Sequence, residues 1–310
     1  MNNTALMKAL RAVNFISKNS VSGEKLRRHR AAMERAGKIA APHLNVEVTP
    51  FSVNGIVCEA IRPQYAHNPQ YAILHIHGGG YVCGGLSYAG ILGGKLAEAT
   101  GFTSYTFDYR LAPENPYPAA LEDALCVWDH LSQRVYEPDH IFIAGESAGG
   151  NLALCLVQKL IADRKTIPRG LLLFSPWTDM TATAPSYDQN AEIDPILTKE
   201  YVTNAAKVYI GEGGTPDDKR FSPLFGSFSD FPPVYIMAGR NGILVDDSIR
   251  LEDTVRGQGG IAVLDIEDAG WHVYQQMPVP IAARAMKRLA AYVSKEIYGE
   301  DKWETTTGQN

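Results

Sequence analysis

Apolar residues are spaced differently in the two parts of this chain. Residues 4–40 carry them at helical intervals among many charged positions, and Gly23 and Gly37 are expected to interrupt the helices. From Asn45 onward, short apolar and β-branched runs take over. We expect strands at residues 46–48, 55–62, 71–76, 103–107, 141–144, 171–174, 234–238 and 261–266.

Helical periodicity fills several of the intervals between these runs. It predicts helices at residues 119–134, 148–163, 246–258 and 279–297. Strands that alternate with helices of this length form a mostly parallel sheet with helices on both faces. The chain is therefore predicted to have an α/β fold.

An insertion interrupts the alternation between residues 177 and 230. It is rich in Asp, Pro, Gly and Thr and contains one helical stretch, residues 198–209. Because open α/β sheets bind ligands at the carboxyl ends of their strands, we expect the insertion and the N-terminal helices to cap that end. The predicted division is cap helices at 1–44, an α/β domain at 45–176 and 231–298, a cap insertion at 177–230 and a flexible tail at 299–310.

Charge and composition exclude several classes of protein. The 310 residues are 45% hydrophobic and 20% charged, with a net charge of −5, which argues against a disordered or nucleic-acid-binding chain. The basic run at residues 25–30 is expected to be the solvated face of a helix rather than a polyanion site.

Cysteine and histidine spacing bears on metals and on location. The four cysteines are spread singly and the histidines are dispersed, so we expect no disulfide framework, metal site or cofactor. Lys8, Arg11 and Lys18 interrupt any signal-peptide core, and no apolar run reaches the roughly 18 residues of a membrane span. These features predict a cytoplasmic protein with no membrane partner.

A serine flanked by glycines is the strongest chemical motif. The sequence Gly145-Glu146-Ser147-Ala148-Gly149-Gly150 follows the strand predicted at 141–144 and precedes a helix. In that context a G-x-S-x-G sequence places the serine hydroxyl on a sharp, strained turn above the sheet. Ser147 is therefore the predicted nucleophile.

A run of glycines follows another predicted strand. His77-Gly78-Gly79-Gly80 comes after residues 71–76, and amides of residues without Cβ atoms can approach a developing oxyanion closely. A phosphate-binding loop is the alternative, but no Lys-Ser/Thr pair follows and no helix is expected to begin there. The motif favours an oxyanion hole.

The histidine count identifies one candidate base. Of the eight histidines, only His272 lies after Ser147, and the α/β-hydrolase order places the histidine last. It lies in Gly270-Trp271-His272-Val273, a predicted loop before the last helix. His272 is therefore the predicted base.

These motifs, together with residues 108–114 and 194–197, resemble those of the bacterial hormone-sensitive-lipase-like esterases over about residues 40–298. The resemblance implies a capped α/β-hydrolase fold, no cofactor, and an oxyanion hole made by the amides of Gly79, Gly80 and Ala148. The register of the glycines leaves Gly78 open. Residues 108–114 are interpreted as charged residues that hold a loop behind the site.

The chain departs from the family at the triad acid. The resemblance implies Gly-Ser-Asp-Glu before an Asp-Asp pair, whereas this chain has Gly239-Arg240-Asn241-Gly242 before Asp246-Asp247. Asn241 stands where the aspartate is expected. Its oxygen can accept the imidazole Nδ1–H, but a neutral amide cannot stabilise an imidazolium, and in a serine protease this change costs about 10⁴-fold in kcat.

Three interpretations of the acid position remain open. Asn241 orients the histidine itself, Asp246 takes over from the start of the next helix, or the position was altered by engineering. Asp246 and Asp247 also have an ordinary role as first-turn helix residues. We adopt Asn241 at the acid site, with reduced activity.

The leading functional expectation is a serine carboxylesterase that forms an acyl-enzyme from short- to medium-chain esters or lactones. A non-catalytic small-molecule-binding protein on the same fold is the alternative: the substituted acid favours it and the presence of His272 opposes it. Amide hydrolysis ranks below both. The expected partner is a small-molecule ester, and a homodimer is expected only because such esterases are often dimeric.

Overall fold

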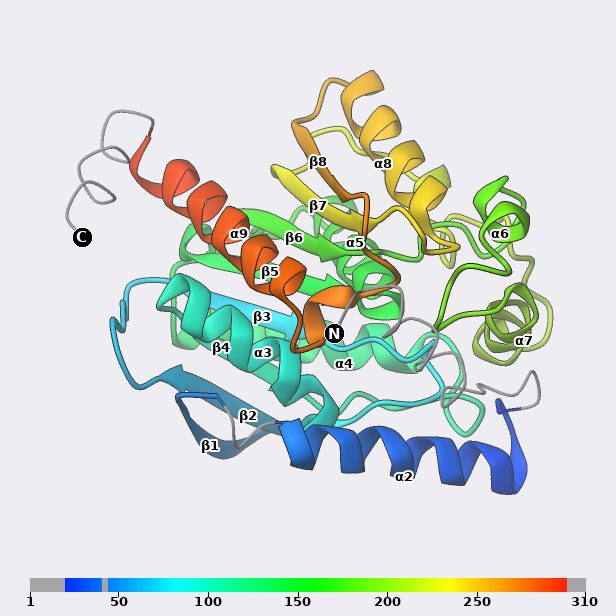
Figure 1. The fold of residues 1–310 in the computed structure, drawn as a ribbon. Helices are drawn as coiled ribbons and strands as arrows, with labels where there is room; N and C mark the ends of the chain where they lie inside the picture. The colour runs from blue at the N-terminus through cyan, green and yellow to red at the C-terminus, as the bar shows by residue number, and fades with distance from the viewer. Residues whose placement is uncertain (1–19, 41–43, 300–310) are drawn as a thin grey trace.

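An eight-stranded sheet forms the centre of the computed structural model, which describes residues 20–40 and 44–299 (Figure 1). The strand order is β1-β2-β4-β3-β5-β6-β7-β8, with β1, β2 and β4 paired antiparallel and the other neighbours parallel. The strands are β1 (Val46–Val53), β2 (Ile56–Pro63), β3 (Ala72–Ile76), β4 (Thr103–Phe107), β5 (Ile141–Glu146), β6 (Gly170–Phe174), β7 (Val234–Gly239) and β8 (Ala262–Glu267). Each predicted run corresponds to one strand, so the predicted α/β fold is confirmed.

The first hairpin extends further than its sequence pattern predicts. β1 pairs with β2 along its whole length, from Val46 opposite Pro63 to Val53 opposite Ile56. The intervening Asn54 and Gly55 both have positive φ, 48° and 87°, as a tight two-residue turn requires. The turn fixes the register, and polar residues beyond the short predicted run are then drawn into the ladder.

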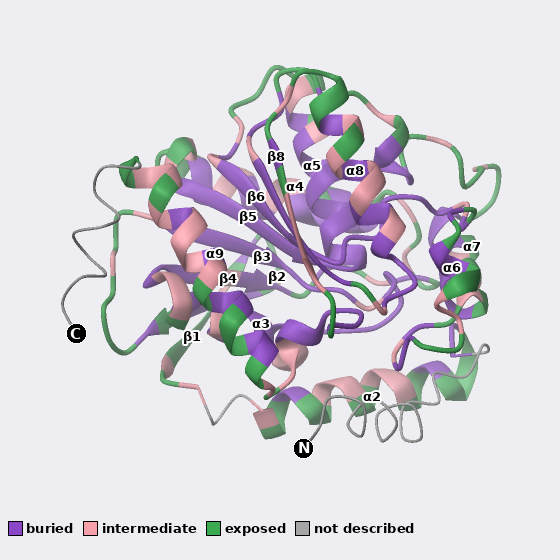
Figure 2. Cartoon of the chain, turned by 45° about the horizontal axis from the view of Figure 1, so that its top comes forward, coloured by how far each residue is buried: buried purple, intermediate pink, exposed green. Residues whose placement is uncertain are grey.

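Helices cover both faces of the sheet, as predicted. They are α2 (Gly23–Ala40), α3 (Leu86–Thr100), α4 (Ala119–Arg134), α5 (Ala148–Ala162), α6 (Ser186–Gln189), α7 (Lys199–Ile210), α8 (Val245–Gly257) and α9 (Pro280–Tyr298). Alternate residues of β6 belong to two different cores, since Leu171 and Leu173 pack with α4, α5 and α8, and Leu172 and Phe174 pack with α3 and α9. The central strands are accordingly buried along their length (Figure 2).

Helix α3 was not expected from the sequence. Its interior contains Gly90, Gly93 and Gly94, which disfavour helix by about 1 kcal/mol each relative to alanine. Packing explains two of them: a Cβ at Gly93 would lie 3.0 Å from Ile61, and one at Gly94 would lie 2.5 Å from Leu44. Close approach to neighbouring elements therefore overrides the local preference.

The N-terminal prediction is partly corrected. Gly23 begins α2 with a φ of +61°, but Gly37 lies inside the helix and does not interrupt it. A Cβ at Gly37 would overlap the Ser87 carbonyl at the start of α3, so the glycine permits a close crossing of two helices. The rest of the predicted N-terminal helical region, residues 4–19, and nearly all of the predicted tail lie outside the described residues.

The insertion lies beyond the carboxyl ends of the central strands, with α6 and α7 at one edge of the molecule (Figure 1). The predicted helix at 198–209 is α7, and the Thr198 side chain caps it by accepting the Tyr201 amide at 3.1 Å. Helix α2 packs on α3 below the same end of the sheet. The exact division into cap and α/β domain stays a prediction.

Candidate active site

Ser147 lies on a strained turn between β5 and α5. Its φ and ψ are 56° and −120°, a conformation unfavourable for a residue with a side chain. The flanking glycines make the turn sterically feasible, because a Cβ at Gly145 would overlap the Gly149 carbonyl and one at Gly149 would overlap the Ile76 carbonyl. The Ser147 amide donates to Phe174 O at 3.0 Å, which ties the turn to β6. The predicted strand, turn and helix are all present.

The glycine run lies beside this turn. Gly79 and Gly80 have φ values of 113° and 65°, and both line the same small cavity as Ser147. Among the described residues, their amides donate to no acceptor, whereas the Gly78 amide donates to Glu146 Oε1 at 2.8 Å. Ala148 is the first residue of α5, so its amide has no partner within the helix. The free amides are therefore the ones predicted for an oxyanion hole, and Gly78 is occupied elsewhere.

Glu146 is a site residue that the sequence analysis did not single out. Its carboxylate is completely buried and accepts from three separate segments. Besides Gly78, it accepts His75 Nε2 at 2.8 Å and Gln276 Nε2 at 3.2 Å. It thus joins the glycine loop, β3 and the segment that follows His272. Only its place beside the predicted nucleophile could have indicated it.

His272 lies in the loop between β8 and α9 and lines the cavity that contains Ser147. Its side chain is largely buried, at 5% exposure, and burial lowers its pKa to about 3. The next residue, Val273, has a positive φ of 49°, rare for a β-branched side chain, and its amide donates to Ser175 Oγ at 3.3 Å. The structure therefore brings the two predicted reactive side chains to one cavity.

The Nδ1 atom of His272 is buried and has no hydrogen-bond partner among the described residues. Asn241 was expected to accept from it, but the Asn241 amide instead donates to Asp268 O at 3.1 Å and Gly270 O at 3.0 Å. The backbone amide of Asn241 also donates to Gly270 O, at 3.0 Å. The expected Asn241–imidazole bond is thus absent, because the side chain is used to hold the loop that carries His272.

The two downstream carboxylates are also engaged elsewhere. Asp246 and Asp247 lie in the first turn of α8, as one interpretation anticipated. Asp246 accepts the Ser186 amide at 2.8 Å, and Asp247 accepts the amides of Thr178 and Asp179 at 2.8 and 3.0 Å. Both fasten the insertion to the α/β core. Burial raises the pKa of Asp247 to about 7.

The cavity at Ser147 is small, about 80 Å³. Its walls come from α2, the glycine loop, the insertion and the loop of His272. Besides Ser147, His272 and the two glycines, its lining includes His29, Met33, Cys83, Tyr88, Trp177, Ile196, Leu197, Tyr201, Val202, Val273, Gln276 and Met277.

The basic run at residues 25–30 is only partly a solvated face. Arg27 and Arg28 are exposed and pair with Glu24, as expected for a helix surface. His29 instead lines the cavity, and Arg30 donates to Val82 O at 2.7 Å and to Glu114. The run therefore also attaches α2 to the loops around the site.

Residues 108–114 hold neighbouring loops, in line with their interpretation as a structural element. Arg110 pairs with Asp123 at 2.9 Å, and the Tyr109 hydroxyl donates to His77 O at 2.8 Å. The Tyr109 ring also stacks on His77, with ring centroids 4.2 Å apart. The start of the glycine run is thereby fixed from behind.

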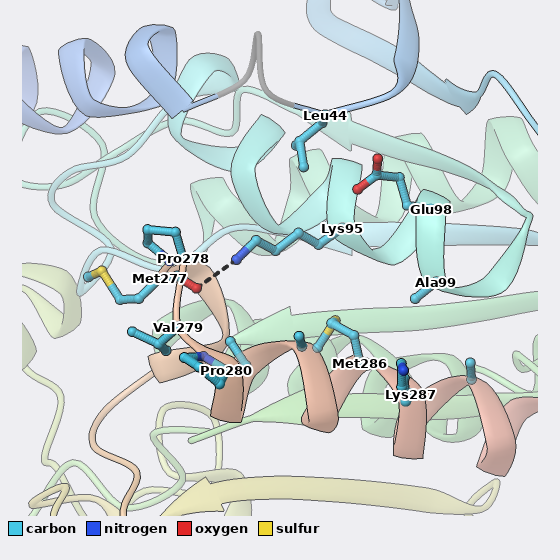
Figure 3. A pocket seen from close by; sticks show the side chains of 13 residues that line it. Leu44, Lys95, Glu98, Ala99, Met277, Pro278, Val279, Pro280, Met286 and Lys287 are labelled. Carbon is cyan, nitrogen blue, oxygen red and sulfur yellow. Dashed lines mark hydrogen bonds between the residues drawn. The ribbon is translucent and has the colours of Figure 1, made fainter. Parts of the chain in front are cut away.

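A larger cavity of about 610 Å³ lies between α3 and α9, away from Ser147 (Figure 3). Its lining is mostly apolar, and Lys95 crosses it to donate to Gln275 O at 2.7 Å and Met277 O at 3.0 Å. Burial lowers the Lys95 pKa to about 8. Because Met277 lines both cavities, Lys95 supports the wall of the smaller one from outside.

Within residues 20–40 and 44–299, no cluster of His, Cys, Asp or Glu could hold a metal ion, and no helix is long and apolar enough to cross a membrane. The four cysteines are free thiols.

Comparison with known proteins gives a consistent family. A family model described as the alpha/beta hydrolase fold matches residues 73–276. An esterase of Acinetobacter venetianus is 30% identical over 267 residues, covering 86% of this chain and 88% of the relative. An acetyl-hydrolase of Streptomyces hygroscopicus is 27% identical over 290 residues, covering 93% of this chain and 95% of the relative.

Solved structures agree with this assignment. The crystal structure of an esterase from the bacterial hormone-sensitive lipase (HSL) family has a TM-score of 0.88 at 28% identity, covering 96% of this chain and 99% of that chain. An esterase/lipase from an uncultured bacterium has a TM-score of 0.87 at 30% identity, covering 95% and 98%. The chain therefore belongs to the α/β-hydrolase fold family, among the esterases related to bacterial hormone-sensitive lipase.

Proposed function

We propose that this protein is a serine carboxylesterase that hydrolyses small esters through an acyl-enzyme. The observation that carries the proposal is the strained Ser147 in one cavity with His272 and two unengaged glycine amides. The names of the relatives, an esterase and an acetyl-hydrolase, support the same class of reaction.

The proposed reaction assigns one task to each group. Ser147 Oγ attacks the ester carbonyl carbon while His272 accepts the hydroxyl proton. The amides of Gly79, Gly80 and Ala148 stabilise the tetrahedral oxyanion. His272 then protonates the departing alcohol, and a water molecule hydrolyses the acyl-enzyme by the same steps in reverse order. Asn241 acts indirectly, by holding the Gly270 carbonyl two residues before His272.

The size of the cavity favours the short end of the proposed short- to medium-chain range. A volume of about 80 Å³ is below the roughly 300–1,000 Å³ typical of small-molecule sites. An acetyl group fills much of such a space, whereas a medium acyl chain must displace side chains such as Tyr201 or Met33. We therefore expect acetate and butyrate esters to react faster than octanoate.

The test is hydrolysis of p-nitrophenyl acetate, butyrate and octanoate by the full chain and by Ser147→Ala and His272→Ala. The proposal requires turnover that Ser147→Ala abolishes and covalent labelling of Ser147 by a fluorophosphonate. Hydrolysis that survives Ser147→Ala would refute the assigned nucleophile. Binding of an ester by the full chain without turnover would favour a non-catalytic binding protein.

A further inference from the structure

Two loops meet backbone to backbone behind His272. One follows β7 and contains Gly239, Asn241 and Gly242, and the other contains Gly270 and His272. A Cβ at Gly239 would overlap the Trp271 backbone, and one at Gly270 would lie 3.0 Å from the Gly239 Cα. The glycines allow this approach, so the loop after β7 packs against the backbone of residues 270–272.

Within that loop, Gly242 faces His272 and Asn241 does not. A Cβ built on Gly242 would lie 3.2 Å from His272 N and 3.5 Å from His272 Cα, with Gly239 O at 3.4 Å. The Asn241 side chain is directed instead to the carbonyls of Asp268 and Gly270. Gly242 is not among the glycines with positive φ, so its φ does not exclude a side chain, but a Cβ 3.2 Å from His272 N requires the two backbones to move apart by a few tenths of an ångström.

The imidazole ring of His272 has a nitrogen without a hydrogen-bond partner among the described residues. Nδ1 of His272 is buried without a partner in the described part of the chain, which is unusual for a buried polar atom. Three carboxylates of the insertion and of α8 bind other groups: Asp194 accepts the Ile243 amide at 2.8 Å, Asp246 accepts the Ser186 amide and Asp247 accepts the Thr178 amide. No described residue accepts the Nδ1–H, and a new side chain that faces His272 could supply the acceptor.

We infer that position 242, rather than 241, is the unfilled acid position of this site, and that a carboxylate placed there would convert a Ser147–His272 pair into a triad. This inference rests on the proposed esterase function. An aspartate at 242 would accept the Nδ1–H, hold the ring in the tautomer whose Nε2 takes the Ser147 proton, and stabilise the imidazolium that forms. The natural chain works without that stabilisation.

The experiment compares Gly242→Asp with Gly242→Asn, which has nearly the same shape without the charge, and with Asn241→Asp. We expect kcat/KM for p-nitrophenyl acetate to be about 10²-fold higher in Gly242→Asp than in Gly242→Asn. The acidic limb of the pH profile should also move to higher pH in Gly242→Asp, because a neighbouring carboxylate raises the His272 pKa. Asn241→Asp should give no gain, since its carboxylate would face two carbonyl oxygens.

Two results would overturn the inference: folded Gly242→Asp with no gain over Gly242→Asn, or a gain of that size in Asn241→Asp. If Gly242→Asp does not fold, proton NMR of the wild-type chain decides. A far-downfield Nδ1 proton on His272 would show that the imidazole already has a strong acceptor, and its absence supports the vacancy.

Failure of the proposed function looks different from failure of this inference. If Ser147 is not labelled by a fluorophosphonate and no variant hydrolyses an ester, the esterase proposal fails. If the parent hydrolyses esters through Ser147 and only the gain in Gly242→Asp is missing, the esterase stands and position 242 is not the acid position.

Discussion

Replacing Glu146 tests whether its buried carboxylate holds the glycine loop, β3 and the segment after His272 together. Its side chain accepts the Gly78 amide and His75 Nε2, both buried, and Gln276 Nε2, which is partly buried. Glu146→Ala leaves these donors without an acceptor. At about 1–3 kcal/mol for each of the two fully buried donors, the Gly78 amide and His75 Nε2, we expect a loss of roughly 2–6 kcal/mol in the free energy of unfolding.

Glu146→Gln is the matched control. Its amide oxygen can still accept from Gly78 and Gln276, while its NH₂ group faces His75. That ring can accept at Nε2 only by moving its proton to Nδ1, which is itself buried without a partner. We therefore expect a smaller loss, about 1–3 kcal/mol, from one unfavourable contact.

Replacing Glu146 should also lower kcat, because Glu146 anchors the glycine loop. The Gly78 amide anchors the loop beside Gly79 and Gly80, so releasing it in Glu146→Ala should displace the proposed oxyanion donors. Loss of one such donor costs about 10²–10³-fold in kcat. We expect a fall of that order in Glu146→Ala and a fall below about 10-fold in Glu146→Gln, with p-nitrophenyl acetate as substrate.

The assays are urea unfolding followed by tryptophan fluorescence and steady-state kinetics on the same preparations. The reasoning is refuted if Glu146→Ala unfolds within about 1 kcal/mol of the parent, or if its kcat is unchanged. A large stability loss with unchanged kcat would separate the two claims, and would show that Gly78 is held in place by other contacts, such as the Tyr109 hydroxyl on His77 O.

Three further predictions concern the surroundings of the site. Burial raises the folded-state pKa of Asp247 to about 7. The folded chain therefore binds more protons than the unfolded chain between about pH 4 and pH 7, so its free energy of unfolding should fall as pH rises through that range. Asp247→Asn should flatten that fall in urea titrations, and parallel profiles would contradict the assignment. Tyr201→Ala should enlarge the cavity and raise the octanoate-to-acetate ratio of kcat/KM by about 10-fold, while Tyr201→Phe should leave the ratio unchanged. Lys95→Met removes the hydrogen bonds to Gln275 O and Met277 O. It should lower the free energy of unfolding by about 1–3 kcal/mol and reduce kcat/KM a few-fold. If neither quantity changes, Lys95 does not support the site.

The sheet could be predicted from the sequence because its strands carry a simple physical pattern. Buried parallel strands such as β5 and β6 are short continuous apolar runs, and every one of them was anticipated. Helix α3 was missed because its interior contains three glycines, and the contacts that explain two of them, Gly93 with Ile61 and Gly94 with Leu44, join residues distant in sequence. Gly37 was misinterpreted for the same reason, since its purpose is a helix crossing.

The site residues also divide into those marked by local sequence and those whose role depends on contacts distant in sequence. Ser147 and the glycine run could be predicted because a strained turn and a row of free amides each need particular residue types next to each other in sequence. Glu146 could not be recognised in this way, because its role depends on three partners at separations of 68, 71 and 130 residues. Its burial and charge become informative only after the fold brings those segments together.

The acid position shows a further limit of sequence reasoning. In the loop after β7, Asn241 is polar and stands where the triad acid is expected, so its residue type suggests a catalytic role. Gly242 has no side chain, so its residue type suggests none. Loop residues have no fixed periodicity that tells which Cβ points where, so adjacent positions are equivalent until the backbone is known. The structure separates them: the polar residue faces two carbonyls, and the glycine faces His272. Asn241 has the right type of side chain, but that side chain points away from His272. Gly242 is directed toward His272 but has no side chain in this protein, so the position proposed to complete the site could not be recognised from residue type.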